Sequence, residues 1–168
     1  MSETTRPATW DDVRLVARVL TDHCVDYALI GGYALAAHGI VRFSEDVDVL
    51  VAPDLGNTHR WIDALAKLPD AAAAELRDEA AELWTGDGPL AIRINDEFTV
   101  DVMAAACGHG WAELAPHIVE KDLDGQLIRV LGLDGLLLTK EGMRDKDKAD
   151  ARILRHLLAA GSATRSSK

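Results

Sequence analysis

Apolar positions recur along the chain at two spacings, one typical of amphipathic helices and one of buried strands. Between Val13 and Leu20 the spacing is helical, and Thr9 is suited to cap that helix. Further helices are predicted over residues 33–38, 54–68, 70–84, 111–114, 133–140 and 145–158. Short apolar runs predict strands at 27–30, 47–52, 90–94, 98–103 and 126–131. This order predicts a mixed α/β (α+β) fold, in which helices cover a small mixed sheet and helices end the chain.

Glycine and proline mark where several of these elements end. Gly39 closes the helix at 33–38, and Pro53 stops the strand at 47–52. The segment 86–89 predicts a turn, and residues 95–97 between two apolar runs predict a hairpin. Small and polar residues predict frayed ends at 1–8 and 161–168, which leaves one domain over 1–168 with its core at about 10–160.

The composition, 48% hydrophobic and 27% charged over 168 residues, is ordinary for a globular domain. No apolar run approaches the roughly 18 residues that a membrane helix needs, and the first residues lack the layout of a signal peptide. We therefore expect a cytoplasmic protein without a membrane partner. Cys24 and Cys107 are far apart and have no second cysteine at metal-binding spacing, so structural thiols are expected rather than a disulfide or metal ligands.

The net charge of −10 disfavours nonspecific nucleic-acid binding, because neutralising phosphates needs clustered lysine and arginine. The charge is uneven, since residues 129–168 hold nine Lys and Arg against five Asp and Glu. A basic C-terminal face could therefore meet nucleotide phosphates or an RNA backbone. An ordinary solvated helix surface would explain the same pattern.

Three aspartates are the first candidates for chemistry. Asp46 and Asp48 are two residues apart at the start of a predicted strand, so both point to one face, with alpha carbons about 6.6 Å apart. Asp101 interrupts the apolar strand at 98–103, where a buried carboxylate needs a partner or a metal. Solvated acids at strand edges remain the ordinary alternative. If the three converge, their hard oxygen atoms suit Mg²⁺ or Mn²⁺ and could hold two ions about 4 Å apart for phosphoryl chemistry.

A glycine pair is the second candidate. Gly31 and Gly32 lie between a buried strand and a short helix, where glycine lets the backbone approach a ligand and the helix start attracts phosphate. Thirteen residues separate Gly32 from Asp46, enough for one short helix and a return loop. Although a lone Gly-Gly is usually a simple turn, this spacing places the glycines beside the carboxylates.

These residues carry a family resemblance. Ile30-Gly31-Gly32, followed after thirteen positions by Asp46-Val47-Asp48-Val49, resembles the signature of the DNA polymerase β-like nucleotidyltransferase superfamily. The longer segment over 31–50 is similar to the small bacterial branch that includes abortive-infection and toxin–antitoxin nucleotidyltransferases. The resemblance extends over about 25–155, is most specific over 29–52, and implies a nucleotidyltransferase fold.

The resemblance also implies roles for single residues. Asp46 and Asp48 would bind both metal ions, and Asp101 would complete the site and help to deprotonate the acceptor hydroxyl. Gly31 and Gly32 would hold the β- and γ-phosphates. Two cations, Arg42 and Lys140, would contact the triphosphate, although ordinary surface lysine remains an alternative for Lys140. His38 and His109 could be bases, but structural or capping roles fit them better.

We therefore expect a metal-dependent enzyme that transfers a nucleoside monophosphate from an NTP, with ATP as the expected nucleotide, to a hydroxyl group. The acceptor could be RNA, a protein or a small molecule, and the basic C-terminal part favours RNA or protein over a cationic drug. A partner such as an antitoxin would fit the toxin–antitoxin resemblance. The alternative is a catalytically silent protein of this fold that binds a nucleotide or a partner protein.

Overall fold

The computed structural model describes residues 5–85, 91–140 and 145–166, without the side chains of 145–146 and 162–166. Its helices are α1 (Trp10–Asp22), α2 (Gly31–Ala37), α3 (Leu55–Leu65), α4 (Trp111–Leu114), α5 (Leu133–Leu138), α6 (Asp145–Ser166) and the 3₁₀ segments η1 (Ala72–Glu79) and η2 (Ala115–His117). Its strands are β1 (Tyr27–Ile30), β2 (Val47–Val51), β3 (Ile92–Asn95), β4 (Thr99–Met103), β5 (Ala105–Ala106), β6 (His109–Gly110), β7 (Ile118–Leu123) and β8 (Gln126–Leu131).

Six of the strands form one mixed sheet in the order β3-β4-β2-β1-β8-β7. The pairs β2–β4 and β1–β8 are parallel, and the other neighbours are antiparallel. The central strands are apolar on both faces, as expected where helices cover both sides. The predicted mixed α/β fold is therefore confirmed, and the central position of β1 and β2 places the glycine pair and two aspartates in the middle of the sheet.

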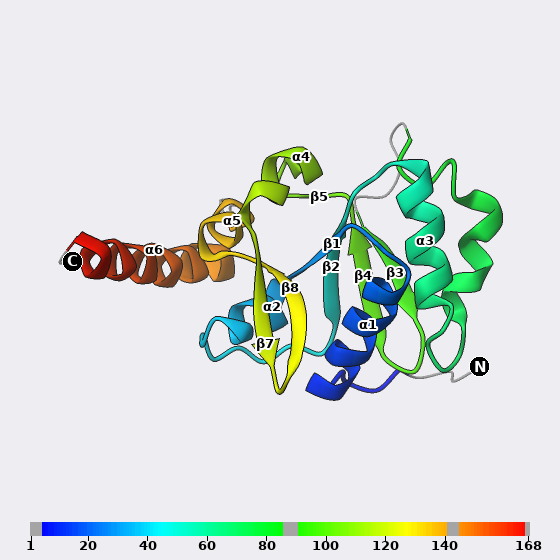
Figure 1. Cartoon of the computed structure of the whole chain (residues 1–168), viewed down its shortest axis with the longest axis horizontal. Coiled ribbons are helices and arrows are strands. Elements are labelled where there is room, and N and C mark those ends of the chain that lie inside the picture. The colour runs from blue at the N-terminus through cyan, green and yellow to red at the C-terminus, as the bar shows by residue number, and fades with distance from the viewer. Residues whose placement is uncertain (1–4, 86–90, 141–144, 167–168) are drawn as a thin grey trace.

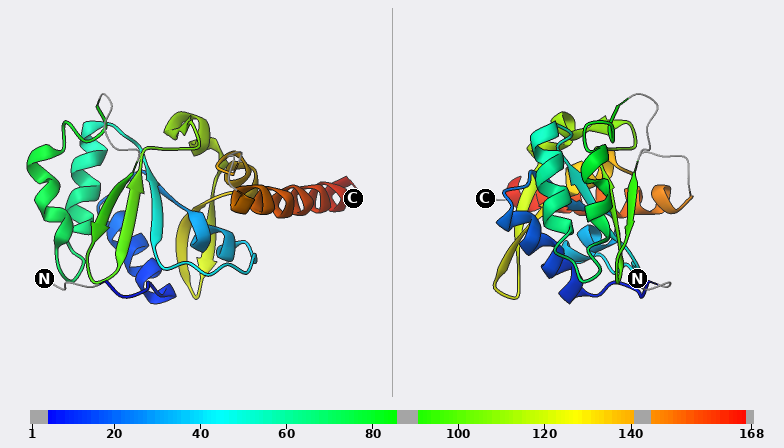
Figure 2. Two further views of the ribbon diagram at one scale, coloured as in Figure 1. Left: turned by 180° about the vertical axis from the view of Figure 1, so that it is seen from behind. Right: turned by 90° about the vertical axis from the view of Figure 1, so that its right-hand side faces the viewer.

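Helices lie on both faces of this sheet (Figures 1 and 2). On one face α1 packs against α3, and on the other face α2 contacts β1, β2 and β8. A capping box between Thr9 and Asp12 starts α1, as the sequence predicts for Thr9. Trp61 and Phe98 are among the largest fully buried side chains of the core. At the C-terminal end α6 packs against α5 and then projects from the body.

Several elements differ from the sequence predictions. The strand β7 was not predicted, because this edge strand has no long apolar run and its exposed and half-buried residues do not alternate regularly. Within the segment predicted as a helix at 70–84, the structure has the 3₁₀ segment η1 (Ala72–Glu79), preceded by Ala71 in the left-handed region. The backbone amides of Asp70 and Ala72 donate hydrogen bonds to the Asp96 carboxylate at its start. The last helix continues through Ser166 rather than ending at 158.

The ends and the loops also differ in part. Residues 5–8 do not fray, since the amides of Arg6 and Ala8 bond to the carbonyls of Glu97 and Glu45 and Ala8 is buried. Cys24 and Cys107 are free and lie at exposed positions, so neither packs in the core. The turn predicted at 86–89 lies outside the described residues. None of the helices in the described part combines the length and apolarity that crossing a membrane requires.

Candidate active site

The three aspartates meet on one face of the sheet. In the parallel pair β2–β4, Asp48 is directly opposite Asp101. Asp46 precedes Asp48 by two residues at the mouth of β2, and its charge acts on Asp48, as the charge of Asp101 acts on both. We call Asp46, Asp48 and Asp101 the acidic corner. The strand pairing thus brings together the three residues that the sequence singled out.

Arg93 is the cation that bonds to the acidic corner among the described side chains. It lies on β3 opposite Asp101, and its guanidinium donates from Nε to Oδ1 of Asp101 at 3.0 Å and from Nη2 to Oδ2 at 3.1 Å. A further hydrogen bond of 3.3 Å joins Nη2 to Oδ2 of Asp46. The Arg93 side chain is nevertheless 62% exposed, so water and dissolved ions compete with it for both carboxylates.

Electrostatic strain in the corner is concentrated on Asp48. Burial, reinforced by the charges of Asp101 and Asp46, raises the pKa of Asp48 to about 7. Burial and the charge of Asp101 also raise the pKa of Asp46 above its ordinary value. Both shifts mean that ionising these carboxyl groups costs free energy in a partly buried site that already carries negative charge, and a bound cation would offset that cost.

The donor set fits a hard divalent cation, because it consists of carboxylate oxygens on adjacent strand positions. In residues 5–85, 91–140 and 145–166, no three acidic, histidine or cysteine side chains are already gathered around one point as metal ligands. The Arg93 guanidinium instead bonds to Asp101 and Asp46. A cation would therefore replace Arg93 as the partner of these two carboxylates.

The glycine pair packs directly against Asp48. Gly31 has a φ of +73°, and a β-carbon there would collide with Oδ2 of Asp48. A β-carbon on Gly32 would come within 2.7 Å of the Ser44 β-carbon. Only glycine fits at both positions, so the glycine turn that begins α2 directly after β1 presents bare backbone beside the carboxylates, as the sequence spacing predicts.

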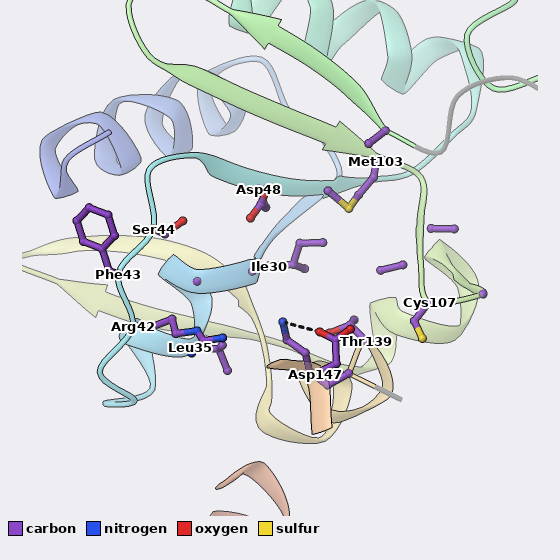
Figure 3. Close-up of a pocket in the computed structure, with 17 residues that line it drawn as sticks. Ile30, Leu35, Arg42, Phe43, Ser44, Asp48, Met103, Cys107, Thr139 and Asp147 are labelled. Carbon is purple, nitrogen blue, oxygen red and sulfur yellow. Dashed lines mark ion pairs between the residues drawn. The ribbon is translucent and has the colours of Figure 1, made fainter. Parts of the chain in front are cut away.

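A cavity of about 670 Å³ opens beside this turn (Figure 3). Its polar lining includes Gly31, Gly32, Ser44 and Asp48, so the glycine turn and one carboxylate of the acidic corner face the same cavity. An apolar lining is formed by Ile30, Leu35, Met103, Ala105 and Ala106. The volume is in the range of pockets that hold small ligands.

Arg42 and Lys140 also line the cavity, where two buried acids hold them. Asp150 is only 2% exposed and lies 3.1 Å from Nη2 of Arg42 and 3.3 Å from Nζ of Lys140. Asp147 lies 3.6 Å from the same Nζ atom. We call Arg42, Lys140, Asp147 and Asp150 the ion-pair cluster. It ties the start of α6 to the segment before β2 and keeps both cations at the cavity.

The two histidines considered as bases have other partners. The Nε2 atom of His38 lies 2.9 Å from the carbonyl oxygen of Leu131, and burial lowers the pKa of His38. The Nδ1 atom of His109 lies 2.8 Å from Oε2 of Glu113. Both contacts agree with the structural roles expected from the sequence.

Four residues at the site were not predicted: Arg93, Phe43, Ser44 and Asp150. The alternation Ile92-Arg93-Ile94 could have shown that Arg93 points away from the core. Its contact with Asp101 depends on the register of the β3–β4 hairpin, which spacing alone does not fix. Asp150 comes to Arg42 from 108 residues away, and no local signal indicates such a pair.

The architecture is similar to that of solved structures. A candidate nucleotidyltransferase from Thermotoga maritima superposes with a TM-score of 0.55 at 12% identity, covering 98% of this chain and 95% of that chain. An antigenic nucleotidyltransferase-like protein from Paracoccidioides brasiliensis gives a TM-score of 0.49 at 18% identity, covering 90% of this chain and 78% of that chain. The first likeness supports the fold alone. None of the curated proteins matches this chain.

The sequence matches a family model more specifically. The model for the nucleotidyl transferase AbiEii toxin of type IV toxin–antitoxin systems matches residues 14–120, more than half of the chain. That stretch contains the glycine turn and the whole acidic corner. The chain therefore belongs to the AbiEii family of nucleotidyltransferase toxins, and it is a nucleotidyltransferase.

Proposed function

We propose that this chain transfers a nucleoside monophosphate from an NTP to a hydroxyl group of an RNA, protein or small-molecule acceptor, with a divalent metal. The observation that carries the proposal is the meeting of the acidic corner with the Gly31–Gly32 turn in the middle of the sheet. ATP is the expected nucleotide and the cytoplasm the expected location. An antitoxin protein would be the partner, in keeping with the family.

Asp46, Asp48 and Asp101 would hold Mg²⁺ or Mn²⁺, and the metal would supply Lewis-acid stabilisation of the charge on the reacting phosphate. Asp101 would take the proton of the acceptor hydroxyl once Arg93 leaves its oxygens. The hydroxyl oxygen would attack the α-phosphorus, and the bond from that phosphorus to pyrophosphate would break. The bare backbone at Gly31 and Gly32 would hold the β- and γ-phosphates, while Arg42 and Lys140 would offset the charge of the leaving group.

The alternative, a silent nucleotide- or partner-binding module, is favoured by one contact. Arg93 already neutralises part of the acidic corner through Asp101 and Asp46, as a substitute for a metal would. A silent module would keep that contact whatever metal is added. It would therefore bind its partner without any metal-dependent gain in NTP affinity.

Labelling in a cell lysate tests the proposal. Each of the four NTPs, labelled at the α-phosphate, is added with Mg²⁺ or Mn²⁺ and the purified protein. We expect label on an RNA, protein or small-molecule acceptor, and none with Asp48→Ala. Asp63→Ala is the control, because Asp63 pairs with Arg77 on an exposed surface outside the site. The absence of label transfer with any NTP, together with the absence of metal-dependent NTP binding, would contradict the enzyme proposal.

A further inference from the structure

One aromatic ring at the cavity is left unused by the proposed chemistry. Phe43 lines the cavity although the residue is 81% exposed. In Figure 3 it lies on the opposite side of Asp48 from Met103. An isolated exposed apolar residue needs no explanation. A large ring at the rim of a ligand-sized cavity, one residue from a cation that lines the same cavity, is a different case.

The backbone on both sides of Phe43 is held in place. Arg42 is fixed by its ion pair with Asp150 at 3.1 Å, and the Ser44 hydroxyl donates to the carbonyl of Asp46 at 2.9 Å. Both side chains also lie within 4 Å of the position that a β-carbon on Gly32 would take. The ring is therefore presented from an ordered segment that packs on the glycine turn. A flat surface positioned in this way loses little conformational entropy when a ligand covers it.

We propose that Phe43 is the stacking surface for the nucleobase of the incoming nucleotide. This inference rests on the proposed function, since it takes the triphosphate to lie at Gly31 and Gly32. A nucleoside triphosphate held there carries one flat, largely apolar group, its base, and Phe43 is the aromatic side chain among the described residues of the lining. Stacking on an aromatic ring accepts every base, so this contact adds affinity for nucleotides without choosing among the four.

The test measures the contribution of the base to binding separately from that of the phosphates. Calorimetric titrations with Mn²⁺ compare inorganic tripolyphosphate with an ATP analogue that has a methylene group between the α- and β-phosphorus atoms. We expect Phe43→Ala to weaken binding of the analogue by about ten-fold and to leave tripolyphosphate binding unchanged. Phe43→Trp keeps a ring and should retain the affinity. Val41→Ala is the matched control, since Val41 is a 99% exposed apolar residue on the same segment.

Equal effects of Phe43→Ala on the two ligands, or no effect on either, would overturn the inference. The proposed function fails in a distinguishable way. In that case the unaltered protein binds neither ligand with Mn²⁺, or Asp48→Asn binds tripolyphosphate as well as the unaltered protein does. Loss of tripolyphosphate binding in Asp48→Asn, with normal analogue binding in Phe43→Ala, leaves the proposed function intact and rejects the stacking role alone.

Discussion

The acidic corner and the ion-pair cluster both gather charged side chains beside one cavity, but their charges add up differently. The corner has three carboxylates and one arginine, Arg93, that is 62% exposed. The cluster has two carboxylates and two cations, and its carboxylates are almost fully buried. The four side chains of the cluster carry no net charge together, whereas the four at the corner carry an excess of two negative charges when ionised.

This difference separates a structural site from a binding site. Buried charges are tolerated when each has a partner, so the cluster can join α6 to the rest of the fold in the folded state without a ligand. The corner has more negative than positive charge, and burial together with the charges of Asp101 and Asp46 raises the pKa of Asp48 to about 7. Removing a carboxylate charge from the cluster should therefore destabilise the folded protein, whereas removing one from the metal-free corner should stabilise it.

The largest stability effect is expected from breaking the cluster. Asp150→Ala leaves Arg42 and Lys140 without a carboxylate that is only 2% exposed. We expect it to lower the free energy of unfolding by about 3–5 kcal/mol, as removal of one partner from a buried ion pair does. Urea unfolding followed by circular dichroism measures this. Asp63→Ala, in the half-exposed pair with Arg77, should cost less than about 0.5 kcal/mol; similar losses in both variants would remove the distinction.

At the corner, removing a carboxylate charge is expected to raise the free energy of unfolding rather than lower it. Asp48 keeps its proton up to a pH of about 7 when folded, but only up to about 3.8 when unfolded. Its protonation therefore favours the folded state at low pH, and that contribution disappears as the pH rises from about 4 through 7. At pH 8 in EDTA, Asp48→Asn should stabilise the protein by on the order of 2–4 kcal/mol. The gain should fade by pH 4, and a destabilised Asp48→Asn protein at pH 8 would be evidence against an unbalanced corner.

A smaller effect, on the affinity for a metal ion, is expected from a substitution of Arg93. A cation that enters the corner has to displace the guanidinium from Asp101 and Asp46, so Arg93→Gln should raise the affinity for Mn²⁺ by several fold. Arg77→Gln is the matched control, because Arg77 is 54% exposed and pairs with Asp63 elsewhere on the surface. Mn²⁺ electron paramagnetic resonance measures the free ion directly. Weaker Mn²⁺ binding in Arg93→Gln would mean that Arg93 supports the site rather than competes with the ion.

The sequence predicted the corner better than the cluster, for a physical reason. Asp46 and Asp48 share a face through the two-residue period of a strand, and the distance from Gly32 to Asp46 limits where the chain can return. These are local constraints. The pairs of Asp150 with Arg42 and Lys140 depend on how α6 docks, and the charge pattern of a helix alone does not specify that docking.

The fold shows the same division. The buried strands β1 and β2 were predicted from their apolar runs, because burial on both faces leaves that signal. The edge strand β7 carries Glu120, Lys121 and Asp122, and its strand structure depends on the ladder with β8. At the start of η1, Ala71 is in the left-handed region and the backbone amides of Asp70 and Ala72 donate hydrogen bonds to Asp96. Residue propensities do not indicate either feature.

Direct titration of Mn²⁺ into the protein at pH 8 tests most directly whether the acidic corner is a metal site. Calorimetry of the unaltered protein should show Mn²⁺ binding, and binding should disappear in Asp48→Asn and in Asp101→Asn. Asp63→Asn, which removes an exposed carboxylate outside the site, should bind like the unaltered protein. Mn²⁺ binding that is the same in Asp48→Asn as in the unaltered protein, or that is absent from the unaltered protein, would contradict the assignment.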